Sequence, residues 1–394
     1  MRLSEITRKG GMSLMFQLLG VILSLGLNLY MTKALGTESY NAYALSLSWV
    51  VLLSHFSLFG FDSLITREMS NRSLDDSVKK AILIKGRNVS FLISLASGLV
   101  LFCFAWFFYD SYEANEAQYA KPAVLIASAG IPLFTMLLYY RSFMKGVKRN
   151  ETGMIPEVLI RPALYLIAIL SLVGYLEGLS VELIVGLNIV AILVSMLFGI
   201  VISKRFWPRK VKAGRFPKMF WKPTITFMFL AVVLWVNNRA DIIMLSFWEN
   251  TVHDVGAYNI ALKLTDFVAM PLVVLNAVFA PYFAEYFQDK KHKGLKPIKN
   301  LIRLVACFSI VLVIGLCFKP ELFLSIFNEE FVSASIPMII LAASQLINVI
   351  VGPVGNALSM ANSEKTVFQV SAVTLAINLV LTGLLIPYYG MMGA

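Results

Sequence analysis

The sequence consists mainly of apolar stretches that are long enough to cross a lipid bilayer, separated by short polar loops. A helix rises about 1.5 Å per residue, so about 20 consecutive apolar residues span the hydrocarbon core. Only 14% of the 394 residues are charged, whereas about a quarter would be charged in a soluble protein. We therefore predict an all-α integral membrane protein. Its eleven expected spans lie near residues 12–34, 42–63, 82–108, 121–141, 155–176, 181–202, 224–248, 256–283, 301–318, 333–357 and 366–387.

The basic residues indicate how the chain is oriented. Of its 34 Lys and Arg residues, 28 lie in the N-terminal tail and in loops on the same side of the membrane. The opposite loops contain Lys33, Lys121 and Lys319. Because basic loops remain in the cytoplasm, we expect a cytoplasmic N-terminus. Topology and contacts with anionic membrane lipids then explain the net charge of +11, and we expect no nucleic-acid partner.

The sequence contains no motif that would indicate an enzyme. It has no G-x-x-x-x-G-K-[ST] phosphate-binding loop and no readable Ser–His–Asp arrangement. The non-cytoplasmic loops, of about fifteen residues at most, are too short to fold as a soluble domain. The cysteines and histidines are isolated or lie in apolar spans, which predicts neither a metal site nor a cofactor: Cys103, Cys307, Cys317, His55, His253 and His292.

The largest cytoplasmic segment, residues 204–223, separates two halves of the chain. It is basic and rich in aromatic residues and proline, which suits a linker and also an amphipathic stretch on the anionic membrane surface. A weak repeat supports two halves, because Tyr40-Asn41 opens the second span and Tyr258-Asn259 opens the eighth, 218 residues later. Six spans separate the two pairs, so both halves would enter the membrane in the same sense.

We accordingly expect an N-terminal lobe at residues 1–203 and a C-terminal lobe at residues 224–394. A pseudo-twofold axis along the membrane normal would relate them, as in transporters built from parallel repeats. Two six-helix lobes require twelve helices, and the second lobe shows only five spans. The expectation is either that its last helix is missing from this chain or that one of the spans is miscounted.

Polar side chains inside the spans are the strongest functional candidates, because a charge at the bilayer centre costs about 2.5–3.5 kcal/mol. Spans seven and eight carry six of them: Asn237, Asn238, Arg239, Asp241, Lys263 and Asp266. Arg239 and Asp241 are two residues apart and point to different sides of a helix, so at least one must meet another helix. An Arg239–Asp266 or Asp241–Lys263 pair would be either a structural ion pair or part of a substrate cavity.

The first half contains a second charged pair. Glu157 and Arg161 lie four residues apart on one face of span five, and Arg161 precedes Pro162, which weakens the local helix. These side chains either face a cavity or extend to the inner interface. Candidates for gating or hinge positions at the ends and breaks of spans are Asp62, Arg67, Gly352 and Pro353.

Six short segments along the chain carry a family resemblance: Arg8–Gly11, Leu35–Tyr40, Phe59–Glu68, Asn238–Leu245, Val255–Tyr258 and Tyr389–Ala394. With these segments the chain resembles the O-antigen repeat-unit flippases of bacterial polysaccharide synthesis. That family belongs to the multidrug/oligosaccharidyl-lipid/polysaccharide exporter superfamily. The resemblance implies two six-helix lobes around a central cavity and transport by alternating access.

The implied substrate is an undecaprenyl-diphosphate-linked oligosaccharide, moved across the bacterial cytoplasmic membrane by a protein that is not an enzyme. The diphosphate of this substrate would bind cations and polar groups that line the central cavity (the lumen), namely Arg239, Lys263, Arg161, Asn237 and Asn238. A gradient of H⁺ or Na⁺ would couple through Asp241, Asp266 or Glu157. The implied partners include a polysaccharide polymerase and assembly proteins.

Three other functions stay open: a drug/cation antiporter of the same superfamily, a lipid II flippase, and a membrane-embedded glycan transferase or polymerase. An antiporter would require a lumen dominated by acidic groups, whereas three cations within spans here balance three carboxylates. A transferase would require acidic residues on larger external loops.

The predicted orientation can be tested by labelling single cysteines in a variant without the three native ones. A cysteine at position 212, in the basic segment, should react with an impermeant maleimide only after the membrane is opened. A cysteine at position 112, in an acidic loop, should react in intact cells. The reverse pattern would show that the basic loops are external.

Overall fold

The computed structural model describes residues 3–35, 37–108, 115–173, 180–208, 211–237, 240–245, 254–288, 295–326 and 329–394. These residues form helices and connecting turns and include no strand. The chain forms two compact units, residues 1–228 and 229–394. We refer to them as unit 1 and unit 2. The division falls inside one helix, a few residues beyond the predicted end of the linker, because the first turns of that helix pack with unit 1.

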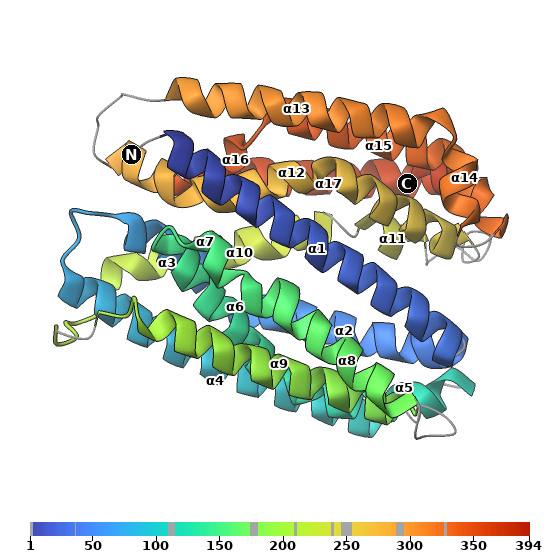
Figure 1. Ribbon diagram of the computed structural model, residues 1–394, viewed down its shortest axis with the longest axis horizontal. Helices are drawn as coiled ribbons and strands as arrows, with labels where there is room; N and C mark the ends of the chain where they lie inside the picture. Colours follow the sequence, from blue (N-terminus) through green and yellow to red (C-terminus); the bar gives the residue numbers. More distant parts are fainter. Residues whose placement is uncertain are drawn as a thin grey trace. The chain divides into compact units, whose positions relative to one another are not determined.

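Within the described residues, unit 1 contains ten helices and one 3-10 turn before the helix that it shares with unit 2 (Figure 1). In chain order these are α1 (Leu3–Leu35), α2 (Thr37–Ser57), α3 (Phe61–Ser70), α4 (Asp76–Phe108), α5 (Asn115–Ser128), α6 (Gly130–Gly146), α7 (Asn150–Gly153), the π-helix η2 (Pro156–Ile160), α8 (Arg161–Val173) and α9 (Val181–Lys204). A 3-10 turn, η3 (Lys218–Phe220), leads into the shared helix α10 (Trp221–Asn237). Helix α6 is the centre of the unit, since it packs against α2, α3, α4 and α9.

The prediction of an all-α membrane protein is confirmed. Within the described residues, seven helices are long and apolar enough to cross a membrane, or up to nine if each of two bent helix pairs is one span. The bent pairs are Ser46–Ser57 with Phe61–Ser70, at 51°, and Lys121–Ser128 with Gly130–Gly146, at 46°. The two remaining predicted spans fall on shorter apolar helical segments, Gly11–Ser24 and Ile302–Phe318, each of which is part of a longer helix. The count of eleven spans stays a prediction.

The bend between α2 and α3 depends on Gly60. Its φ of 76° lies in the left-handed region, which residues with a Cβ rarely adopt. A Cβ at this position would also collide with the Thr224 carbonyl oxygen and lie 2.8 Å from the Met228 nitrogen, both on α10. The glycine therefore allows the chain to turn and the first half of α10 to pack against the turn.

The basic linker is held on unit 1. The Gly214 N–H donates to the Ser77 carbonyl at 3.1 Å, and Lys80 donates to the Val211 carbonyl at 2.6 Å. Phe216 packs on Phe61 with ring centroids 6.2 Å apart. The described linker residues between α9 and Lys218 form turns and irregular chain, and the amphipathic contact with the membrane surface stays a prediction. Prolines at positions 208 and 217 explain the absence of a regular helix.

Unit 2 contains the second half of α10 and nine further elements, arranged around the long helix α12 (Figure 1). These are α11 (Ala240–Leu245), α12 (Asp254–Gln288), α13 (Leu295–Phe318), α14 (Pro320–Ser325), the 3-10 turn η5 (Glu329–Ala334), α15 (Ser335–Val351), α16 (Val354–Met360), α17 (Glu364–Tyr389) and the 3-10 turn η6 (Gly390–Gly393). Helix α12 packs against α13, α15 and α16. Its contacts with α14 and α15 bury an apolar cluster that includes Ala257, Ala261, Leu324 and Met338.

The structure breaks predicted span ten at Gly352 and Pro353. Gly352 has a φ of 78°, and two residues separate the end of α15 from the start of α16. The Asn356 side chain donates to the Asn276 carbonyl on α12 at 2.7 Å, which holds α16 in place. The break is a structural fact, whereas the role of Gly352 and Pro353 as a hinge stays a prediction.

We predict that Gly60→Ala destabilises the protein by about 2–4 kcal/mol, because it combines an unfavourable φ with a backbone collision. Gly186→Ala is the matched control, since a Cβ there meets nothing within 4 Å in the middle of α9. Thermal unfolding in detergent should show a lower Tm for the first variant and an unchanged or higher Tm for the second. Equal Tm values would contradict this account of the turn.

Candidate functional site

A short ion pair between two elements of unit 1 joins Arg141 to Glu157. Arg141 lies on the last turns of α6, and its Nη1 is 2.6 Å from Oε2 of Glu157 in η2. The two side chains are 28% and 17% exposed, so the pair is neither sealed in the core nor on the open surface. Charge-assisted bonds of this length are among the strongest hydrogen bonds in proteins.

Arg161 lies beside this pair. Its guanidinium carbon is 5.0 Å from the centroid of the Phe134 ring on α6, which is a cation–π contact. Arg161 and His55 both interact electrostatically with the Glu157 carboxylate. The direct partner of Glu157 is Arg141, and a shared role of Glu157 and Arg161 stays a prediction.

A π turn positions Glu157. The Arg161 N–H donates to the carbonyl of Pro156, five residues earlier, rather than four as in an α-helix. Pro162 has no N–H to donate to Val158, which removes one α-helical bond at this point. π turns of this kind occur frequently at functional sites.

Helix α1 supports the outside of the π turn through a glycine. A Cβ at Gly20 would lie 2.6 Å from the Val158 carbonyl oxygen, so only glycine permits this approach. The backbone next to Glu157 is therefore packed against α1.

Two further charges extend the group along α6 and α3. Lys145 lies four residues after Arg141, and these two positive charges repel each other. The negative charge of Asp62 attracts Lys145. We call Asp62, Arg141, Lys145, Glu157 and Arg161 the charge cluster of unit 1. It contains three cations and two carboxylates, so it has a net positive charge when all five are ionised.

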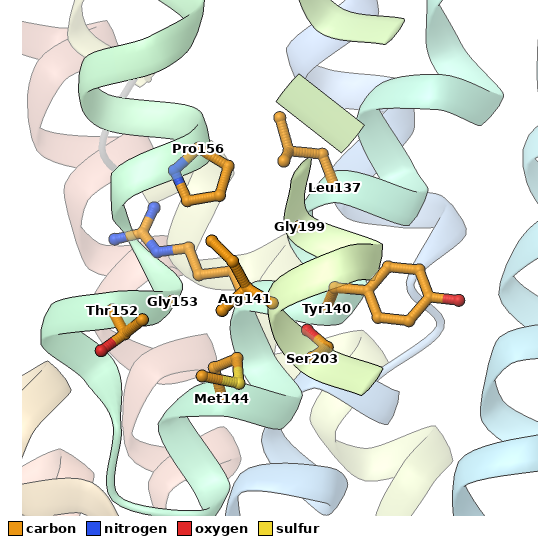
Figure 2. Close-up of a pocket in the computed structure, with 10 residues that line it drawn as sticks. Leu137, Tyr140, Arg141, Met144, Thr152, Gly153, Pro156, Gly199 and Ser203 are labelled. Carbon is orange, nitrogen blue, oxygen red and sulfur yellow. The ribbon is translucent and has the colours of Figure 1, made fainter. Parts of the chain in front are cut away.

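A narrow crevice lies next to the cluster, between α6, α7, η2 and α9. Its lining includes Arg141, Thr152, Pro156 and Ser203. Figure 2 shows the Arg141 side chain reaching toward the turn that carries Pro156, whereas the Tyr140 ring points the opposite way. The Ser203 hydroxyl is buried and has no hydrogen-bond partner among the described residues. The crevice is too narrow to admit a ligand.

Unit 2 holds a separate set of polar contacts between its helices. The Tyr258 hydroxyl on α12 donates to Oδ2 of Asp241 on α11 at 2.9 Å. Asn378 on α17 donates to Oδ1 of Asn237 on α10 at 3.5 Å, and the Thr382 hydroxyl donates to Oδ1 of Asn378 at 2.8 Å. Asp241 and Asn237 were both predicted from the sequence, and each is bonded to a side chain of another helix.

The other predicted residues have different surroundings. Lys263 and Asp266 are exposed on one face of α12. Arg67 is 2% exposed, bonds Glu68 at 2.8 Å and stacks on Phe227, which fits a structural role. Arg239 and Asn238 lie outside the described residues. The functional roles of these residues, and the Asp241–Lys263 and Arg239–Asp266 pairs, stay predictions.

Arg141, Lys145 and Tyr258 were not among the site residues predicted from the sequence. Arg141 and Lys145 were counted with a cytoplasmic loop because the fourth span was expected to end at residue 141. The helix continues to Gly146, which keeps both side chains in the folded unit. Their spacing of four residues at the end of an apolar helix was the available signal. Within the described residues no group of three or more His, Cys, Asp or Glu is placed to hold a metal ion.

Comparison with known proteins gives three kinds of match. The sequence profile of the polysaccharide biosynthesis protein family matches residues 6–287. A probable low-salt glycan biosynthesis flippase of Haloferax volcanii, Agl15, is 24% identical over 220 residues. That match covers 53% of this chain and 46% of the relative, so it spans about half the length of that protein.

Solved transporter structures share the fold along the whole chain. An outward-facing multidrug resistance MATE family transporter of the MOP superfamily superposes with a TM-score of 0.73, at 12% identity, over 98% of this chain and 90% of its own. A mutant of the Vibrio cholerae MATE transporter VcmN gives a TM-score of 0.74 at 14% identity, over 99% and 91%. A MOP superfamily transporter from Pyrococcus furiosus gives 0.69 at 12% identity, over 98% and 89%. At such identities these matches show the fold alone.

We predict that Tyr258→Phe lowers the stability of unit 2 by about 1–3 kcal/mol, because it removes the hydrogen bond to the Asp241 carboxylate. Tyr388→Phe is the control, since Tyr388 is 83% exposed. Thermal unfolding in detergent should separate the two variants. If both unfold at the temperature of the wild type, the Tyr258–Asp241 bond contributes no stability.

Proposed function

Because the chain belongs to the polysaccharide biosynthesis protein family, we propose that it is a flippase for a lipid-linked oligosaccharide and not an enzyme. The proposed substrate is an undecaprenyl-diphosphate-linked repeat unit of the O-antigen or capsule type. The protein would act in a bacterial cytoplasmic membrane, with its N-terminus in the cytoplasm. The transporter fold and the similarity to a probable glycan flippase support this assignment.

The charge cluster of unit 1 is the observation that carries the proposal. A diphosphate linked to sugars cannot cross hydrocarbon unaided, because isolated charges are costly there. The cluster places three cations in or beside helices that are apolar enough to span a membrane. Arginine suits this task, since its planar guanidinium binds phosphoryl oxygens through two parallel hydrogen bonds.

The other residues predicted from the sequence, in both units, extend the proposal. Lys263 and Arg239 would add positive charge to the substrate path, and Asn237 and Asn238 would bind polar groups of the substrate. Asp241, Asp266 and Glu157 are the candidate groups for coupling transport to H⁺ or Na⁺. Asp62, Arg67, Gly352 and Pro353 stay candidates for gating. A polymerase and assembly proteins of the polysaccharide are the proposed protein partners.

A drug/cation antiporter is the second candidate, and the fold shared with multidrug transporters favours it. A lumen for organic cations should be dominated by carboxylates, however, whereas the charge cluster holds more cations than carboxylates. We therefore favour an anionic substrate. A membrane-embedded transferase or polymerase is less well supported, because the matching structures are transporters.

Translocation in proteoliposomes tests the proposal. A polyprenyl-diphosphate oligosaccharide is incorporated, and an impermeant glycosidase outside the vesicles reports its appearance in the outer leaflet, with and without a proton or sodium gradient. We expect the wild type to expose the substrate faster than protein-free vesicles, by about tenfold or more, since the barrier for a charged headgroup is large.

Arg161→Ala and Lys263→Ala should reduce this rate about tenfold each, because each removes one cation from the path. Lys365→Ala is the control, as Lys365 is an exposed cation at the start of α17. Uptake of a cationic dye without any exposure of the glycan would favour the antiporter.

A further inference from the structure

We propose that Arg141 and Arg161 form a diphosphate-binding site in unit 1, and that the Glu157 carboxylate occupies this site when no substrate is bound. The proposal rests on the proposed function and adds to it a residue outside the predicted lumen set, Arg141, and an internal competitor, Glu157. Substrate would bind by taking the place of the carboxylate, so that one anion leaves the arginines as another arrives.

The geometry of the pair resembles that of an arginine with a bound anion. Arg141 Nη1 and Glu157 Oε2 are 2.6 Å apart, within the range for a guanidinium bound to a carboxylate or phosphate oxygen. The same guanidinium fork binds both kinds of anion, because both present oxygens at matching spacing. A phosphoryl group can therefore replace the carboxylate without a change in the Arg141 donor.

Arg161 provides the second cation of the site. It stacks on Phe134 of α6 and lies within electrostatic range of Glu157, whose direct partner is Arg141. Lys145 at the end of α6 and Asp62 on α3 carry opposite charges, which offset each other when both groups are ionised. Arg141, Arg161 and Glu157 together then carry one positive charge, and the two arginines alone carry two. Two guanidinium groups match the two phosphoryl groups of a diphosphate diester, each of which is negatively charged.

The need for an internal partner follows from the membrane environment. A charge left without a counterion in a partly buried site is strongly destabilising. Without substrate, Glu157 supplies that counterion; with substrate, the diphosphate supplies it. The side chains of Arg141 and Glu157 are 28% and 17% exposed, so the protein does not cover the pair completely.

Because the backbone of the π turn is held in place, replacement of the carboxylate by substrate requires a movement of the Glu157 side chain alone. Gly20 of α1 contacts the Val158 carbonyl and fixes the backbone next to Glu157. Glu157 can then leave Arg141 by rotation of its own side-chain torsions, with α8 and η2 in place. The structural alternative is a permanent ion pair that holds α6 to η2, and it predicts no effect of Glu157 on ligand affinity other than through stability.

Direct binding distinguishes these two roles. The affinity of undecaprenyl diphosphate is measured for the full chain in nanodiscs, with Glu182→Gln in α9 as the control. Glu157→Gln should bind about tenfold more tightly than the wild type, because the internal competitor loses its charge. Arg141→Gln and Arg141→Lys should bind about tenfold more weakly, since both lose the guanidinium fork. In an Arg141→Gln background, Glu157→Gln should give a smaller gain than it gives alone.

The outcomes separate this inference from the proposed function. If the wild type binds and translocates the lipid but Glu157→Gln binds it no more tightly, the exchange is wrong and the flippase assignment stands. If the wild type neither binds nor translocates it, the proposed function fails. Inorganic pyrophosphate serves as a second probe, and the same order of affinities supports recognition of the diphosphate itself. A gain from Glu157→Gln that is absent with pyrophosphate would contradict a diphosphate site.

The exchange can still be tested if Arg141→Gln fails to fold. Arg141→Lys keeps the charge next to Glu157, so its Tm should stay near that of the wild type while its affinity falls. Loss of affinity in proportion to loss of Tm across all the variants would show a structural ion pair and overturn the exchange.

Discussion

The hydrocarbon of the membrane offers no hydrogen-bond partner, and this constraint accounts for most features of the structure. Backbone groups are paired within helices, and charged side chains in or near the spans find partners in the protein. Arg141 with Glu157 and Arg67 with Glu68 are ion pairs of this kind, at 2.6 and 2.8 Å. The first pair depends on the packing of α6 against η2, whereas the second joins neighbouring residues of α3.

The departures from regular helix share a physical cause. At Gly60 and Gly352 the chain takes a positive φ, and at Pro162 an N–H is missing. Each departure is accompanied by close packing of another element. The start of α10 lies against Gly60, α1 lies against the π turn, and Asn356 bonds to α12 just after Gly352. The breaks are therefore held in place, and the π turn directs Glu157 toward Arg141.

The same ion pair connects stability to the proposed transport. An arginine kept in a low-dielectric region for binding an anion needs a counterion in the absence of that anion. A glutamate on a neighbouring helix meets this need and can be displaced. The proposed path for a diphosphate would then carry its own internal anion, and the excess of cations over carboxylates in unit 1 favours an anionic substrate over a cationic one.

The sequence alone determined the class of protein, the approximate spans and several of the polar residues, because hydropathy over about 20 residues and the position of prolines are local properties. Glu157, Arg161, Asp241 and Asn237 were identified for this reason. Only the tertiary structure decided which groups meet. It paired Glu157 with Arg141 and Asp241 with Tyr258, and it held the linker on unit 1. Such contacts join residues 16 to 137 positions apart and depend on how helices pack, which no local pattern encodes.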